Sequence, residues 1–305
     1  MDLVLDKIIS NPAFVIAISP DCTKIAVSGE RTITIFSFPD LQQIEKLKVA
    51  HTCSMVFLSD SRSLLIQNTT GKTFVWNGIS LESTGKWPVP KWQEKPMFYC
   101  GDDHVLWAGH GGIWMYDARE RKISNIFSSP RDLWICRCEE DVIKCIAMDY
   151  GEGENTVDIL SLTYEGSIQK QAQSDIQVKN GVFKSPAWSN DDLIAISTSV
   201  RPNFPLNIVY LLNTEGQVLG QEWVPAGEDN GSFYYGNNMF IKISMVGAYN
   251  INIYNANNIE LIYKLDCQKL ASYGMTTPPT FAWITPDNRI LVGSWNKLFV
   301  FKFES

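Results

Sequence analysis

One short turn sequence recurs along the whole chain, and this repetition constrains the fold more than any other feature. Each copy follows an apolar run and contains Asp, Asn or Glu. The seven copies are Pro20-Asp21, Ser59-Asp60, Gly101-Asp102, Glu139-Glu140, Ser189-Asn190, Gly236-Asn237 and Pro286-Asp287. They recur at intervals of roughly 38 to 50 residues, about 44 on average, and a period in this range indicates stacked copies of one supersecondary unit. The chain is therefore expected to fold as seven repeated units.

The first unit shows the expected organisation most clearly. Residues 13–19 form a continuous apolar run, as is typical of a strand covered on both faces. Residues 24–28 and 31–38 follow as two further strand-like runs, and residues 42–48 are mostly polar, so polarity rises through the unit. β-Branched and aromatic runs between turn residues continue along the chain, which favours sheet throughout. Residues 268–273 are expected to form a short helical turn inside a loop.

The last unit is one strand short. Residues 281–303 supply three strand-like runs, and an unpaired outer edge would favour aggregation. Residues 2–10, before the first unit, form a strand-like run without a partner. Pairing this run with the last unit removes both difficulties. The sequence therefore predicts an all-β fold in a single domain over residues 1–305. This fold is a seven-bladed β-propeller of four-stranded antiparallel blades, with the N-terminal strand completing the last blade.

Composition narrows the class of partner and the cellular setting. The chain is 45% hydrophobic and only 19% charged, so it can bury a large core. Its net charge of −7 disfavours a nucleic acid or an anionic membrane as the main partner. Seven scattered cysteines, an odd number, favour reduced thiols over a disulfide framework. Together with the absence of a secretory signal pattern or a membrane-spanning run, this predicts a cytoplasmic protein. We also expect the chain to be monomeric by itself.

Two of the turns and several strand endings resemble a known family. The run Ile18-Ser-Pro-Asp21 leads into Lys24-Ile-Ala-Val27, and Thr285-Pro-Asp287 leads into Arg289-Ile-Leu-Val292. Endings such as Phe74-Val-Trp-Asn77 are similar to a decayed Trp-Asp ending. In these features the chain resembles the WD40 and WD40-like β-propellers. One departure is Gly109-His110, which lies between the second and third strands, whereas the family places this pair before the first strand. The resemblance implies a scaffold that gathers protein partners, usually without catalysis.

The loops of such a ring fall on two rims. The links between blades and the links between second and third strands share one rim, which we call the top rim; the other hairpins form the bottom rim. Top-rim loops are rich in aromatic residues, Arg and Pro, a composition typical of interface hot spots. The candidate partner-binding residues are Trp87, Trp92, Tyr150, Arg201, Phe204, Trp223, Tyr249, Tyr273 and Trp295. The alternative for each is that the side chain folds back to fill the ring, since large aromatics are often buried.

The bottom-rim turns are acidic, and two explanations are open. Their carboxylates, among them Asp21, Asp60, Asp103 and Asp287, could receive a basic partner. Alternatively, Asp is present because its side chain accepts hydrogen bonds from the backbone of its own turn.

Evidence for catalysis or a metal site is sparse in the sequence. Asp149 and Glu154 could act as acids at the mouth of the channel, whereas the three histidines have no ligand spacing. Cys136, Cys138 and Cys145 could meet on neighbouring strands, but buried thiols explain them as well. We therefore expect a non-catalytic scaffold that binds a protein or peptide at the top rim and channel mouth, without metal or cofactor. The alternatives are a propeller enzyme of the hydrolase or lyase kind, a binder of a small ligand in the central channel, and a structural module of a larger assembly.

Overall fold

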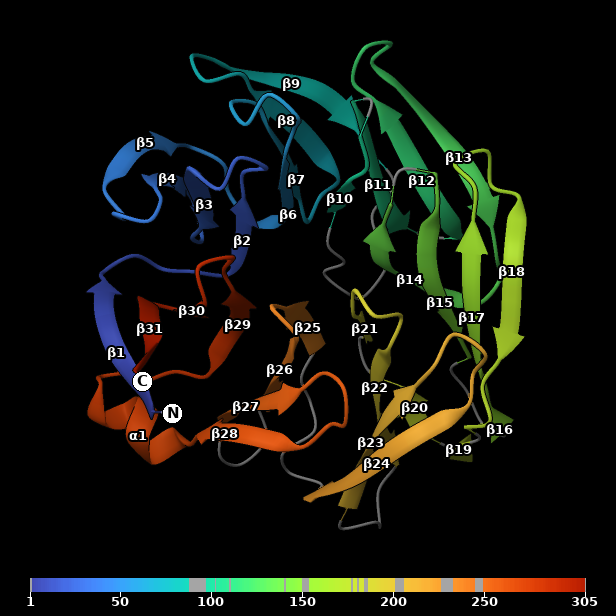
Figure 1. Cartoon of the computed structure of the whole chain (residues 1–305). Helices are drawn as coiled ribbons and strands as arrows, with labels where there is room; N and C mark the ends of the chain where they lie inside the picture. Colours follow the sequence, from blue (N-terminus) through green and yellow to red (C-terminus); the bar gives the residue numbers. More distant parts are fainter. Residues whose placement is uncertain are drawn as a thin grey trace.

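A computed structural model of the chain shows an all-β architecture. It describes residues 2–87, 97–101, 103–109, 111–139, 141–149, 154–176, 178–179, 181–183, 186–200, 206–225, 233–244 and 249–304. The strands form seven antiparallel sheets of four or five strands and one additional two-stranded sheet (Figure 1). The seven sheets are the blades of a propeller, numbered here in chain order.

The blades have the following strands, given from the inside outward. Blade 1 contains β2 (Val15–Ile18), β3 (Lys24–Ser28), β4 (Ile33–Ser37) and β5 (Gln43–Leu47); blade 2 contains β6 (Thr52–Phe57), β7 (Leu64–Asn68), β8 (Lys72–Trp76) and β9 (Leu81–Lys86). Blade 3 contains β10 (Met97–Tyr99), β11 (His104–Gly109), β12 (Gly112–Asp117) and β13 (Lys122–Ser128); blade 4 contains β14 (Asp132–Cys138), β15 (Ile143–Met148), β17 (Val157–Leu162) and β18 (Ile168–Gln173). Blade 5 contains β20 (Gly181–Phe183), β21 (Ala187–Trp188), β22 (Ile194–Val200), β23 (Leu206–Leu212) and β24 (Val218–Pro225). Blade 6 contains β25 (Phe233–Gly236), β26 (Met239–Ser244), β27 (Asn250–Asn255) and β28 (Leu261–Leu265); blade 7 contains β29 (Pro279–Ile284), β30 (Arg289–Ser294), β31 (Leu298–Glu304) and β1 (Asp2–Ile9).

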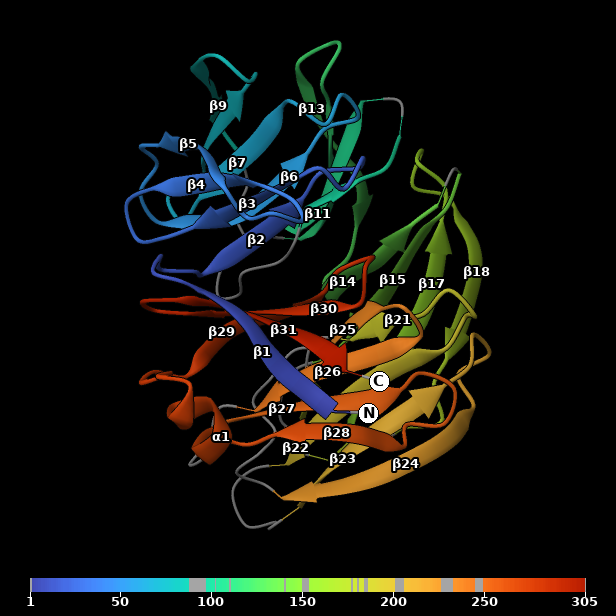
Figure 2. The same cartoon turned by 60° about the vertical axis from the view of Figure 1, so that its left-hand side comes forward.

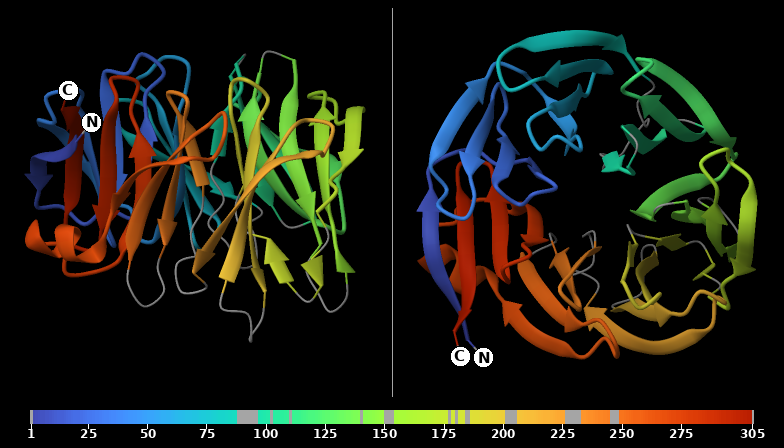
Figure 3. Two further views of the ribbon diagram at one scale, coloured as in Figure 1. Left: turned by 60° about the horizontal axis from the view of Figure 1, so that its bottom comes forward. Right: turned by 45° about the horizontal axis from the view of Figure 1, so that its top comes forward.

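The blades close into a ring. The inner strands contact one another in the cyclic order β2, β6, β10, β14, β21, β25, β29 and back to β2. Figure 3 shows the same circular arrangement. Five of the seven recurring turn sequences lie wholly within the described residues, each at the junction of the first and second strands of its blade, and Gly101 and Glu139 occupy the same junction in blades 3 and 4. The predicted period and blade count are therefore confirmed.

The N-terminal strand completes blade 7, as predicted. β1 runs antiparallel to β31, with Leu3 opposite Phe303 and Ile9 opposite Leu298. The two ends of the chain therefore lie side by side (Figure 1). Without β1, the outer edge of β31 would be unpaired.

Blade 5 differs from the regular unit that the sequence predicts. Its inner strand is in two pieces, because β20 and β21 both pair with β22, at different heights. Pro186 lies between the two pieces, and a proline has no N–H to donate to a sheet. A two-stranded sheet of β16 (Glu154–Asn155) and β19 (Val178–Lys179) is a second addition to the predicted plan.

The short helix expected near residue 268 is present as α1 (Cys267–Ser272), between blades 6 and 7. Asp266 caps it, because its carboxylate accepts a hydrogen bond from the N–H of Lys269 at 2.8 Å.

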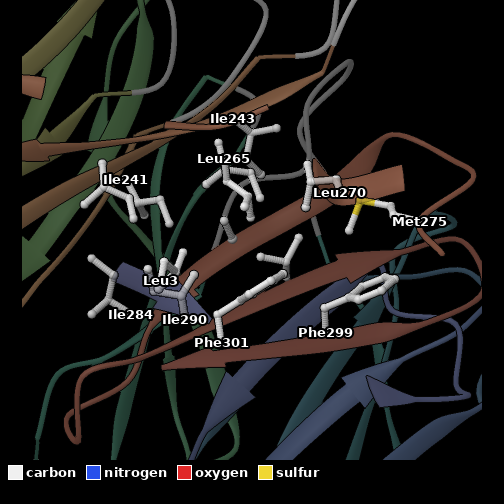
Figure 4. Close-up of a cluster of buried hydrophobic side chains, with 14 residues drawn as sticks. Leu3, Ile241, Ile243, Leu265, Leu270, Met275, Ile284, Ile290, Phe299 and Phe301 are labelled. Carbon is white, nitrogen blue, oxygen red and sulfur yellow. The ribbon is translucent and has the colours of Figure 1, made fainter. Parts of the chain in front are cut away.

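The hydrophobic core lies between the blades. Buried apolar side chains form seven clusters, one at each junction of neighbouring blades. Successive side chains of a strand point to opposite faces of its sheet, so each inner strand contributes side chains to the junctions with both neighbouring blades. Figure 4 shows the cluster between blades 6 and 7, in which Leu3 of β1 lies among Ile284, Ile290 and Phe301. The closing strand thus contributes to the core as well as to the sheet.

Candidate functional site on the top rim

Five of the nine candidate partner-binding residues fall within the described part of the chain. Trp92, Tyr150, Arg201 and Phe204 lie outside the described residues. The other five are Trp87, Trp223, Tyr249, Tyr273 and Trp295, and the structure places them in three different settings.

Trp87 belongs to the core, which corrects its proposed role in binding. Its side chain is only 3% exposed. The indole stacks on Trp107 at 4.9 Å between ring centroids and lies 4.5 Å from the ring of Tyr116. It therefore fills the junction of blades 2 and 3, as the alternative of an inward-folded aromatic requires.

Trp223 is exposed, but it lies in a strand and not in the top-rim loop to which the sequence assigns it. It belongs to β24, the outer strand of blade 5, where it pairs with Ile208. Its side chain is 56% exposed. Because outer strands line the circumference of the ring, Trp223 lies away from the channel mouth.

Tyr249 and Tyr273 are half-buried, and both contact residues beneath the surface of the top rim. The Tyr249 hydroxyl donates a hydrogen bond to the carbonyl of Met275 at 3.1 Å. Tyr273 ends α1 and lies 5.8 Å from the ring of Phe301, in the core between blades 6 and 7. Both side chains therefore fix the segment that follows α1.

Among the described candidates on this rim, Trp295 is exposed. It lies in the link between β30 and β31 and is 63% exposed. Figure 2 shows this link on the same side of the ring as α1. The edge of one ring meets the face of the other where Trp295 contacts Phe14, with centroids 5.2 Å apart. Phe14 is not among the candidates that the sequence suggests, although Phe14 lies just before the first strand of blade 1 and therefore on the same rim.

Hydrogen bonds hold the link that carries Trp295. The backbone N–H of Trp295 donates to the Thr277 hydroxyl at 3.4 Å, and the Lys297 ammonium donates to the Gly274 carbonyl at 3.2 Å. The backbone N–H of Ala13 donates to the carbonyl of Ser294 at 2.9 Å. These bonds tie the link to the segment after α1 and to the entrance of blade 1. We call Phe14, Tyr249, Tyr273 and Trp295 the aromatic rim patch.

Asp21 and Asp103 of the bottom rim accept hydrogen bonds within their own turn or from neighbouring turns. Asp21 accepts hydrogen bonds from the Ser19 hydroxyl and from the Thr23 N–H, and these bonds lower the pKa of its carboxyl to about 2. Asp103 accepts hydrogen bonds from Arg119 and Ser59, which lower its pKa as well. Turn chemistry and contacts between neighbouring turns therefore account for these carboxylates without a basic partner.

Asp149, one of the two acids considered for catalysis, has structural partners, whereas the side chain of Glu154 lies outside the described part of the structure. Asp149 forms an ion pair with Arg131 at 2.9 Å and accepts a hydrogen bond from Thr156. Burial raises the pKa of the Cys145 thiol to about 12, and it also raises the pKa values of Cys136 and Cys138, so these thiols stay protonated at neutral pH. In the described part of the chain, no group of three His, Cys, Asp or Glu side chains is placed to hold a metal ion.

Comparison with protein-family models matched none of them, and comparison with the curated proteins gave no significant match. Among the described residues, none of the helical structure is long and apolar enough to cross a membrane.

Proposed function

We propose that the protein is a non-catalytic scaffold that binds a protein or peptide partner at the aromatic rim patch. The observation that carries this proposal is the exposure of Trp295 on a rim segment held by hydrogen bonds. An exposed indole presents a large apolar surface and an N–H donor to a partner, and Trp is among the residues most enriched at binding hot spots.

The framework around Trp295 favours binding by lowering its entropic cost. Thr277, Gly274 and Ala13 are joined to the link by hydrogen bonds, and Phe14 contacts the indole ring. Groups that are already ordered lose less freedom when a partner arrives. The patch also spans blades 6, 7 and 1, so a partner placed there would contact several blades at once.

We further propose kinship with the WD40-like propellers, supported by two turns with the same hydrogen bonds. In blade 1, Ser19 Oγ donates to Asp21 and accepts from the Lys24 N–H at 2.9 Å. In blade 7, Thr285 Oγ1 donates to Asp287 and accepts from the Arg289 N–H at 2.9 Å. The seven free cysteines support a cytoplasmic setting for the proposed binding.

Peptide selection with a matched pair of variants tests the assignment of the site. A random displayed peptide library is selected on the immobilised wild-type protein, and the enriched peptides are measured against Trp295→Ala and Ile79→Ala. Ile79 is the control, because it is 95% exposed but lies in the hairpin between β8 and β9 on the bottom rim. Thermal melts establish that both variants are folded.

We expect the Trp295→Ala variant to bind the selected peptides about 30-fold more weakly, since truncation of a hot-spot Trp costs about 2 kcal/mol or more. The Ile79→Ala variant is expected to bind them as the wild type does. Peptides that bind all three proteins equally would refute the site, and a failure to enrich any peptide would count against the proposed function.

A further inference from the structure

The outer strands of the seven blades differ in how their open edges are protected. An outer strand presents unpaired N–H and C=O groups, and proteins commonly place Lys there to prevent association with another strand. Six of the outer strands contain such a residue: Lys7, Lys46, Lys86, Lys122, Lys170 and Lys264. β24, with the sequence Val-Leu-Gly-Gln-Glu-Trp-Val-Pro, contains neither Lys nor Arg. A register shift against the neighbouring strand occurs in all seven outer strands, so this feature does not set β24 apart. The missing cation does, and Pro225 protects only the last position of the strand.

β24 also exposes large apolar side chains. Leu219 is 53% exposed and Trp223 is 56% exposed. The neighbouring outer strand β28 adds exposed Leu261 and Ile262. The two strands run along adjacent parts of the circumference (Figures 1 and 3), and a Cβ added at Gly220 would lie 3.9 Å from the carbonyl oxygen of the turn before β28. Blades 5 and 6 therefore share an apolar outer surface next to an unprotected edge.

The sequence of β24 is self-complementary in antiparallel pairing. If two copies align about Gln221, Leu219 of each copy lies opposite Trp223 of the other, and Gly220 lies opposite Glu222. Apolar pairs that include an aromatic residue stabilise neighbouring strands. The two Gln221 amides can donate to and accept from each other. Glu222 is the one charged residue of the strand and does not oppose its own copy, so this pairing places no like charges opposite each other.

From these observations we propose that β24 pairs with β24 of a second copy of this chain to form a two-fold symmetric dimer. The interface is isologous, as is usual for homodimers, because the same residues contribute from both sides. It joins two blades through their outer strands and leaves both rims open. This proposal replaces the expectation of a monomer stated in the sequence analysis, and it is independent of binding at the aromatic rim patch.

Sedimentation equilibrium over a concentration series tests the pairing. The substitution Leu219→Lys introduces on β24 the cation that the other outer strands have. The control is Ile44→Lys, which makes the same change at a residue that is 50% exposed on β5, a strand that already contains a lysine. We expect a dimer in the wild type and in the control, and at least a tenfold higher dissociation constant for Leu219→Lys. A wild type that is monomeric at every concentration up to about 1 mM, where even an association free energy of about −4 kcal/mol would be detected, would overturn the proposal.

A cross-linking variant locates the symmetry axis. Residues directly opposite in an antiparallel pair have Cβ atoms about 5 Å apart. Gln221→Cys should therefore form an intermolecular disulfide under mild oxidation, whereas Ile44→Cys should not. Equal cross-linking of both variants, or a dimer that persists in Leu219→Lys, would assign association to another surface. Binding of an unrelated extended peptide at β24 by a monomeric wild type would equally refute the second copy as the occupant.

Discussion

The closing strand offers the sharpest test of the architecture, through the substitution Leu3→Ala. Leu3 is fully buried in the cluster between blades 6 and 7, and Leu→Ala changes at such sites cost about 2–5 kcal/mol. Unfolding entropy near the melting temperature is about 2.1 cal/mol/K per residue. For 305 residues this amounts to about 0.64 kcal/mol/K, so 1 kcal/mol corresponds to about 1.6 °C. Leu3→Ala should therefore lower Tm by about 3–8 °C.

The matched control is Ile8→Ala on the same strand. Ile8 is 38% exposed, so its truncation should cost about 1 kcal/mol or less, and Tm should fall by less than about 2 °C. Calorimetry of both variants, together with a chain that lacks residues 2–9, measures the contribution of β1. If the Leu3→Ala and Ile8→Ala variants have the same Tm, or if the shortened chain has the Tm of the wild type, then β1 does not close blade 7 in the way described.

Two further predictions concern the turns. The pKa of Asp21 is lowered in the folded state, from an ordinary 3.8 to about 2, so its contribution is complete above about pH 4 and is lost as the pH falls toward 2. Asp21 is exposed, and solvent screening reduces this contribution to about 1 kcal/mol. The free energy of unfolding, measured by denaturant titration, should therefore fall by about 1 kcal/mol less between pH 5 and pH 2 in Asp21→Asn than in the wild type. An equal fall in both proteins would contradict this cause. Gly166 has φ +81°, and a Cβ there would overlap the carbonyl oxygen of Ile126 in blade 3. Gly166→Ala should therefore destabilise the protein by at least 2 kcal/mol more than Gly101→Ala, which has a similar φ and open space around it; equal losses would show that only backbone strain matters.

The candidate site was only partly predictable from the sequence. Residue type and loop position place Trp87 and Trp295 in the same class, yet Trp87 is stacked on Trp107 in the core and Trp295 is exposed. The difference depends on which neighbouring blade offers a space for the indole, and that space is formed by residues far away in the sequence. Trp223 shows a related error, because β24 extends through residues that the sequence assigns to a loop.

The architecture was predictable from local, repeated signals in the amino-acid sequence. The seven turns, the alternation of apolar positions and the capped helix α1 each depend on neighbouring residues. The missing fourth strand of the last unit was also visible, since an unpaired edge must be covered. Only the folded ring shows which aromatics are buried, which residues β24 contains, and which apolar side chains of β24 and β28 lie next to each other on the circumference. These properties arise between blades, where the outcome depends on packing and on surfaces that the ring brings together from distant parts of the chain.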